Sequence, residues 1–321
     1  MLDAATRKRF EQQAEMLANR VKKRFKHLHK RFARRQIEVF RLYDGDIPEI
    51  RAAVDWYAGH LVVAEYMRRQ SVPEWLPTMG AAVARALDVP EDKVHLKNRW
   101  AGRQEGRRYE RLDRTDRKIV VRERDLRFYV NLWDYVDTGL FADHRDTRRM
   151  VRGMAAGKTF LNLYCYTGAF SCYAAKGGAA LTVSVDRSRT ALDRARANMI
   201  LNGMDPARNP LIQSGTRAFL TSAKHEGRRF DLAVVDPPSY STSREGQRDF
   251  DILRDHPAIL ASVIAVMRPG GIVFFSTNHQ DFIPRLKELP LARVEEITHR
   301  TLPEDFRQKH KTLHRCWQLT V

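Results

Sequence analysis

Hydrophobic side chains recur at spacings of three and four residues along the first part of the chain, and no Pro or Gly interrupts them. Because this spacing places side chains on one face of a helix, the pattern predicts a single amphipathic helix over residues 1–35. The recurring apolar residues are Phe10, Ala14, Leu17, Val21, Phe25, Leu28 and Phe32.

Residues 36–130 are predicted to form a small α/β, RNA-binding domain with a helix at 76–87. Its expected strands are at 37–42, 61–64, 94–96 and 118–122. The stretch between the last two strands is polar, rich in arginine and interleaved with Trp100 and Tyr109. Such a hairpin suits contacts with phosphates and unpaired bases, and an ordinary charged surface loop is the alternative.

From residue 131 onward, apolar strand-like runs alternate with helical stretches such as 188–201, 216–225 and 250–267. Seven strands are expected, at 159–165, 180–186, 210–213, 230–235, 271–277, 294–298 and 316–321. The alternation indicates a mostly parallel sheet with helices on both faces. The chain is therefore expected to be an α/β protein whose largest domain, 131–321, is Rossmann-like with a seven-stranded sheet.

Positive charge is the strongest compositional feature. Among 321 residues, 57 are Lys or Arg and 39 are Asp or Glu, which gives a net charge of +18. Residues 1–35 hold twelve of the basic residues and only three acidic ones. Clustered positive charge favours a polyanionic partner, because neutralising phosphates releases counterions. We interpret residues 1–35 as an RNA-contacting arm; a linker helix packed by its apolar stripe is the alternative, and both descriptions can hold together.

Cysteine content and hydropathy exclude several classes of protein. The three cysteines are scattered and have no C-x-x-C spacing, so neither a disulfide framework nor a metal site is expected. The chain has no run of 18 apolar residues and no apolar secretory segment. We therefore expect no membrane-spanning part and a cytoplasmic location.

The first strand of the large domain ends in NLYCYTG, residues 162–168, ahead of a helical run. Ligands bind outside the carboxyl ends of strands in such sheets, and the small residues Thr167 and Gly168 allow a ligand to approach the backbone. The next strand ends in Asp186, whose carboxylate suits both hydroxyls of a ribose; a helix cap, for which Ser188 competes, is the alternative. Together the two strand ends predict a site for an adenosine-containing cofactor.

The fourth strand of the sheet runs into Asp236-Pro237-Pro238-Ser239-Tyr240. This turn is similar to the [ND]PP[YF] motif of methyltransferases that act on amino and ring nitrogens, with one extra residue before the aromatic. Two prolines stiffen the turn, Asp236 can hold a base edge, and Tyr240 can stack on the base. The target base is expected to leave its helix to reach this pocket. A rigid turn with Tyr240 packed in the core is the alternative.

The absence of cysteine near this turn bears on the acceptor atom. Methylation at C5 of a pyrimidine needs a thiolate that adds to C6 of the base. No cysteine occurs after the turn, in DPPSYSTS, or after the next strand, in GGIVFFSTNH. A nitrogen acceptor is therefore favoured over C5.

These motifs resemble the rRNA large-subunit methyltransferase K/L family, specifically the C-terminal methyltransferase half of that two-activity enzyme. The resemblance extends over almost the whole chain and is most specific in TGLFADHR, GGIVFFSTNHQ and TLPEDFRQKHKTLHRCW. It implies a class I methyltransferase that uses S-adenosylmethionine to form 7-methylguanine in 23S rRNA of the large-subunit precursor. Because N7 of guanine carries no proton, Asp236 is expected to hold the base rather than accept a proton.

The resemblance also assigns individual residues to the cofactor. Residues of the GLFADHR turn are expected to cover it, and His144 in that turn to make a structural hydrogen bond rather than act as a base. The expected catalytic residues are Asp236, Pro237, Pro238 and Tyr240. The expected cofactor-binding residues are Phe141, Asp143, Arg145, Asn162, Tyr164, Tyr166, Thr167, Gly168, Asp186, Arg187, Ser188, Gly215 and Thr216.

One position departs from the family. Members of the family usually have an acid where this chain has Gly215, and the resemblance implies that this acid normally accepts a hydrogen bond from the adenine amino group. Its loss leaves the backbone and hydroxyl of Thr216 as the expected adenine contacts. The alternatives that stay open are an rRNA guanine-N2 or cytosine-C5 methyltransferase, and a non-catalytic RNA-binding factor in ribosome assembly.

Overall fold

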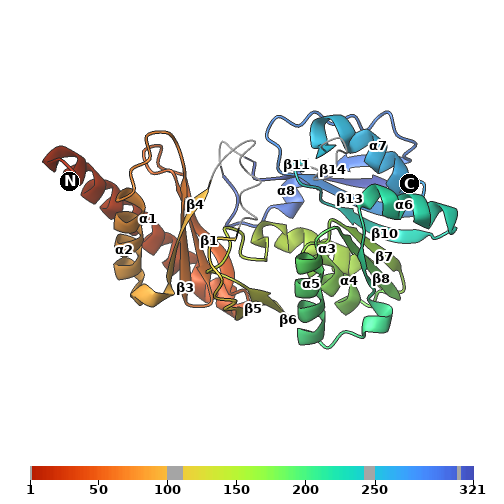
Figure 1. Ribbon diagram of the computed structural model, residues 1–321, viewed down its shortest axis with the longest axis horizontal. Coiled ribbons are helices and arrows are strands. Elements are labelled where there is room, and N and C mark those ends of the chain that lie inside the picture. The colour runs from red at the N-terminus through yellow and green to blue at the C-terminus, as the bar shows by residue number, and fades with distance from the viewer. Residues whose placement is uncertain (1, 100–110, 242–249, 309–311) are drawn as a thin grey trace. The chain divides into compact units, whose positions relative to one another are not determined.

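The computed structural model describes residues 2–99, 111–241, 250–308 and 312–321 (Figure 1). These residues form two compact units, Met1–Thr138 and Gly139–Val321. The boundary lies later than the expected one at residue 130, and the basic N-terminal helix belongs to the first unit. The predicted hairpin residues Trp100 and Tyr109 lie outside the described residues.

The first unit is built on the four-stranded sheet β1-β2-β3-β4. Its strands are β1 (Val39–Asp44), β2 (Ala52–Tyr57), β3 (His60–Tyr66) and β4 (Val94–Arg99). The first three strands pair antiparallel, whereas β4 runs parallel to β3 because α2 (Trp75–Leu87) carries the chain back between them. The sequence did not predict β2, since nearly all of its side chains are buried and so show no alternation of polar and apolar residues.

Helix α1 (Ala4–Arg34) confirms the predicted amphipathic helix, and the Asp3 side chain caps its first turn. The apolar stripe is buried in the hydrophobic core of the first unit, and Phe25 is partly buried against it. Ten of the twelve basic side chains in residues 1–35 are exposed. The helix therefore packs by its stripe while its basic face points to solvent.

A buried carboxylate explains why the first unit continues past the hairpin of β5 (Ile119–Glu123) and β6 (Leu126–Val130). Asp134 is fully buried and accepts hydrogen bonds from the backbone and hydroxyl of Thr115 and from the Asn131 amide. Burial raises the pKa of Asp134, but these hydrogen bonds outweigh it and hold the value at about 2. The segment after β6 is thus tied back to the segment before β5.

The second unit contains a seven-stranded sheet in the order β14-β15-β13-β10-β7-β8-β9, which confirms the predicted fold class. The central strands are parallel, and β15 runs antiparallel to both neighbours. The strands are β7 (Thr159–Leu163), β8 (Leu181–Asp186), β9 (Leu211–Gln213), β10 (Phe230–Val235), β13 (Met267–Thr277), β14 (Arg293–Glu296) and β15 (Arg315–Thr320).

Helices bury both faces of this sheet (Figure 1). Phe160 of β7 packs with residues of α3 (Arg145–Met154) and α4 (Ala169–Lys176), whereas the next residue, Leu161, packs with residues of α6 (Thr216–His225) and α7 (Ile252–Ile264). This alternation is the period of two that a strand imposes. The two-sided burial explains why the strands read as continuous apolar runs.

Several predicted boundaries in the second unit were wrong. The helix expected over 250–267 is shorter, because Phe250–Asp251 form strand β12, Asp251 caps α7, and β13 begins at Met267. The last residue of the strand expected at 294–298 instead opens the short helix α8 (Thr298–Thr301). In the described part of the chain, no helix is long and apolar enough to span a membrane.

Candidate active site

The loop between β7 and α4 holds three residues in the left-handed backbone region. The φ angles are +56° at Tyr164, +50° at Tyr166 and +73° at Gly168. Bulky residues seldom adopt positive φ, and such conformations concentrate at functional sites where surrounding contacts enforce them. The NLYCYTG motif is therefore a constrained loop at the carboxyl end of a central strand.

The carboxylate of Asp186 joins this loop to the next one. Its Oδ2 accepts a hydrogen bond from the backbone N–H of Tyr166 at 2.9 Å, and its Oδ1 accepts one from the N–H of Ser188 at 2.8 Å. Ser188 itself caps α5 (Arg189–Leu201), where its hydroxyl accepts from Ala191 N–H. Ser188, and not Asp186, is therefore the helix cap. The carboxylate of Asp186 is partly exposed, and each of its oxygens has a further lone pair that a ligand can use.

Buried polar side chains hold the loop from behind. The amide of Asn198 in α5 donates to the Thr167 carbonyl at 2.9 Å, and the Thr167 hydroxyl donates to the Gly139 carbonyl at 2.7 Å. The Asn162 amide donates to the Ser171 hydroxyl. Asn162 and Thr167 are 1% and 2% exposed, so their side chains support the loop from within.

Aromatic side chains flank the loop. The rings of Phe141, from the GLFADHR turn, and Tyr166 lie 5.4 Å apart. Tyr164 lies beside Thr216 at the start of α6, and burial raises the pKa of its hydroxyl although a hydrogen bond to Thr216 opposes the shift. The structure therefore brings most of the expected cofactor residues to adjoining strand ends, and Arg187 is exposed beside them.

The turn after β10 is braced by the end of the neighbouring strand β13. The Ser276 hydroxyl donates to Oδ1 of Asp236 at 2.6 Å, and the Ser239 hydroxyl donates to the Asn278 side chain at 2.7 Å. Tyr240 is 40% exposed. Its hydroxyl shares a hydrogen bond of 2.8 Å with a ring nitrogen of His279, the residue after Asn278.

These bracing residues were not assigned from the sequence. Their only sign there was a run of polar residues, STNH, at the carboxyl end of an apolar strand. Because parallel neighbours place their carboxyl ends at one edge of the sheet, such a run faces the turn after the adjacent strand.

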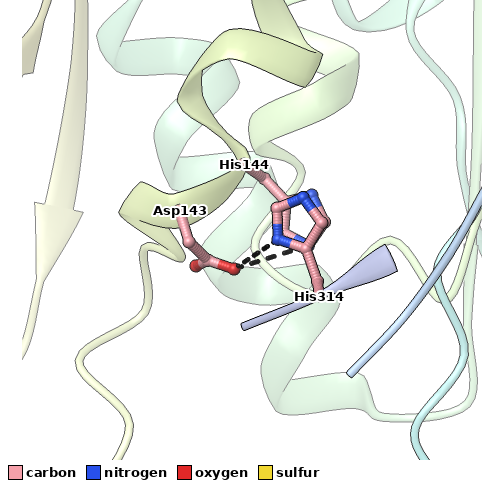
Figure 2. A group of neighbouring side chains, drawn as sticks. All are labelled: Asp143, His144 and His314. Carbon is pink, nitrogen blue, oxygen red and sulfur yellow. Dashed lines mark hydrogen bonds and ion pairs between the residues drawn. The ribbon is translucent and has the colours of Figure 1, made fainter. Parts of the chain in front are cut away.

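Figure 2 shows a group of neighbouring side chains, Asp143, His144 and His314, that joins two motifs distant in the sequence. The rings of His144 and His314 stack at 4.2 Å, and His314 shares hydrogen bonds with the Asp143 carboxylate and the Thr301 hydroxyl. Nε2 of His144 lies 3.7 Å from a carboxylate oxygen of Asp143 and equally far from one of Asp236. Burial, followed by the charge of His314, lowers the pKa of His144 and favours its neutral form.

The same group was compared with a metal site, since ligand atoms of Asp143, His144 and His314 all lie within 4.8 Å of one another. Two imidazoles that share an ion must direct their in-plane lone pairs at it. Here the two ring planes are only 11° from parallel and stack face to face, so their lone pairs do not converge on one point (Figure 2). The arrangement fits a stacked pair of rings better than a metal centre. Among the described residues, only the His314 ring of this pair is hydrogen-bonded, and the structural hydrogen bond expected of His144 is not formed, because its Nδ1 is buried without a partner and its Nε2 lies 3.7 Å from both carboxylates.

Arg145, expected near the cofactor, is 2% exposed and forms an ion pair with the buried Asp305. This pair ties the GLFADHR turn to the TLPEDF segment. The structure thus gives Arg145 a partner inside the protein, in line with a supporting role.

Comparison with known proteins identifies the family. A family model described as S-adenosylmethionine-dependent methyltransferase matches residues 47–297. Ribosomal RNA large subunit methyltransferase K of Neisseria meningitidis is 41% identical over 310 residues, which cover 94% of this chain and 86% of that protein. The chain belongs to this methyltransferase family. S-adenosylmethionine is accordingly its cofactor.

Longer relatives share the same region. Ribosomal RNA large subunit methyltransferase K/L of Pseudomonas putida is 44% identical over 323 residues, which cover 98% of this chain but only 43% of that protein. Among solved structures, a putative methyltransferase complexed with SAH has a TM-score of 0.78 at 21% identity, covering 97% of this chain and 82% of that one. An S-adenosylmethionine-dependent methyltransferase from Agrobacterium tumefaciens has a TM-score of 0.59 at 14% identity, covering 84% and 87%. These two likenesses support the fold.

The loops of this methyltransferase fit the cofactor. A Cβ on Gly168 would come within 2.9 Å of the Ala195 Cβ, so only glycine lets the loop pass this close to α5. The Asp186 carboxylate has lone pairs left that suit the hydroxyls of a ribose, and Gly215, at the start of α6, borders open space. When bound, S-adenosylmethionine supplies an electrophilic methyl group on a sulfonium.

Replacing Gly168 with alanine is expected to weaken S-adenosylmethionine binding roughly tenfold or more, because the added Cβ forces the loop away from α5. Isothermal titration calorimetry measures the change. Gly203→Ala is the matched control, since Gly203 also has a positive φ of +66° but its Cβ would meet nothing within 4 Å. The control should lose some stability and keep its affinity; equal loss of affinity in both variants would contradict the role of Gly168.

Replacing Gly215 with aspartate is expected to strengthen cofactor binding. The position is the N-cap of α6, with an ordinary φ of −68° and open space around a Cβ, so aspartate fits there. A carboxylate that accepts from the adenine amino group should lower Kd by about tenfold, since a hydrogen bond to a charged group contributes about 1.5–3 kcal/mol. Isothermal titration calorimetry measures the Kd of S-adenosylmethionine for Gly215→Asp and for the control Gly215→Ala. Identical Kd values in the two variants would place Gly215 away from adenine.

Proposed function

We propose that this chain transfers a methyl group from S-adenosylmethionine to N7 of a guanine in 23S rRNA of the large-subunit precursor. The ribosomal RNA named for its K and K/L relatives supports the substrate class. The resemblance of TGLFADHR, STNHQ and the C-terminal motif to that family supports guanine N7. The burial of all three cysteines is the observation that supports a nitrogen atom as the methyl acceptor.

All three cysteines are unsuited to nucleophilic attack. Cys165, Cys172 and Cys316 are buried, and burial raises the pKa of each thiol. A C5 methyltransferase needs an accessible thiolate beside the base. The position next to Asp236 is instead held by the hydroxyl of Ser276, which donates to the carboxylate.

The residues of the turn suit a base that needs no proton removed. Asp236 is oriented by Ser276, so its remaining lone pairs can accept from the N–H groups of guanine. Tyr240, partly exposed, can stack on the ring, and the two prolines fix the distance between them. Because N7 carries a free lone pair, catalysis then depends on orientation and on keeping water from the methyl group.

Guanine N2 is a second candidate, and one observation favours it. An exocyclic amine loses a proton on methylation, and the neutral ring of His144 lies 3.7 Å from the Asp236 carboxylate, where it could receive that proton by way of Asp236.

The decisive measurement is mass spectrometry of nucleosides from 23S rRNA of cells with and without the gene, and from RNA treated with the purified protein. We expect 7-methylguanosine to disappear without the gene and to be restored by the protein. Appearance of N2-methylguanosine would transfer the proposal to the second candidate, and 5-methylcytidine would refute the argument from the cysteines. Binding of RNA without any methylation would indicate an assembly factor.

The RNA arm needs a test that leaves the fold intact, since deleting residues 1–35 would remove part of the core of the first unit. Changing the exposed Lys22, Lys23, Lys26 and Lys30 to glutamine removes four charges from α1 and keeps its apolar stripe. If these side chains contact phosphates, the slope of log K against log salt should fall by up to about three. Filter binding measures the slope, and the four-fold lysine-to-arginine variant should keep it. An unchanged slope in the glutamine variant would make α1 a linker.

A further inference from the structure

His279 lies against the hydroxyl of Tyr240, at the end of the segment that braces the DPPSY turn. The Tyr240 hydroxyl and Nε2 of His279 are 2.8 Å apart, and the two rings meet at 63° with centroids 5.6 Å apart. Tyr240 is exposed to solvent and His279 is partly exposed. His279 therefore contacts the hydroxyl edge of the Tyr240 ring, and this contact covers neither face of the ring.

The direction of this hydrogen bond follows from the other ring nitrogen. The backbone N–H of Asp281 donates to Nδ1 of His279 at 3.2 Å. Because a neutral imidazole has one acceptor and one donor nitrogen, Nε2 then carries the proton and donates to the Tyr240 oxygen. The lone pair of Nδ1 is engaged, so the ring is not arranged to act as a base.

The other end of Tyr240 is also fixed. Its backbone pairs with Asp251 in the two-stranded sheet of β11 (Tyr240–Ser241) and β12, and the carbonyl of Ser239 accepts from Ile252 N–H. The side chain is thus held at its backbone and at its hydroxyl before any ligand arrives. Immobilising the ring in advance removes an entropic cost that would otherwise be met when the bound base reaches its reactive orientation, a factor of roughly three to ten.

We propose that His279 is a positioning residue that holds the ring of Tyr240 in the orientation on which the target base stacks. The inference rests on the proposed function, because it takes the base to stack on Tyr240. Ser276 and Asn278 fix the turn itself, so each residue of this segment that touches the turn has a separate partner there. His279 is distinguished by acting on the only aromatic ring of DPPSY.

A double-mutant cycle tests whether His279 acts through the hydroxyl. His279→Ala and Tyr240→Phe each remove one side of the contact, so each should lower kcat for methyl incorporation into RNA by roughly three- to tenfold, with the Kd of S-adenosylmethionine unchanged. The double variant should be no worse than either single variant, since the same contact is lost in all three. Additive losses would overturn the proposal.

Two further variants separate positioning from general damage to the fold. His279→Gln retains a side-chain N–H donor and should recover at least half of the lost kcat. His225→Ala, at an exposed histidine in the last turn of α6, should leave kcat unchanged. Failure of glutamine to recover activity in a variant with unchanged thermal stability would also overturn the proposal.

The tautomer can be checked without substrate. Nitrogen-15 NMR of the full chain should show the proton of the His279 ring on Nε2, and a ring protonated on Nδ1 would overturn the proposal. Incorporation is counted as total methyl transferred, whichever nucleoside is formed. A product other than 7-methylguanosine would therefore refute the proposed function while the cycle still decides the role of His279.

Discussion

The hydrogen bonds of the Asp186 carboxylate are the interactions on which the arrangement of the loops after β7 and β8 depends. By accepting backbone N–H groups from both Tyr166 and Ser188, this carboxylate connects the two loops. Residues with unfavourable backbone conformations cost on the order of 1–3 kcal/mol each. Two tyrosines adopt such conformations here, and buried partners such as Asn198 keep them in place. The cofactor loop is therefore shaped by the protein before the cofactor binds.

The order of the strands then determines where the DPPSY turn lies. Strand β10 is the direct neighbour of β7, so the DPPSY turn emerges beside the cofactor loop. Strand β13 is the next neighbour, and its polar end supplies the braces for that turn. In the function proposed above, loops from the carboxyl ends of adjoining strands hold the donor of the methyl group, the acceptor and the groups that orient the acceptor.

Features with a local period or a local motif could be predicted from the sequence. The stripe of α1, the strands of the parallel sheet and the cap at Ser188 all follow from spacing within one element. Contacts between distant segments could not be predicted in this way. The partners in Arg145–Asp305 and His144–His314 are separated by some 160 to 170 positions, and only the topology brings them together. Strand β2 was missed for a related reason, because burial on both faces removes the alternation that marks a strand.

Burial of all three thiols also has a practical side. Alkylating reagents react with thiolates at the surface, whereas these thiols are buried and burial raises the pKa of each. The native chain is thus a ready background for spectroscopy: a single cysteine introduced on the exposed face of α1 would take up a fluorophore selectively. Binding of RNA to the basic face of α1 can then be followed in a protein that has lost none of its own residues from the core.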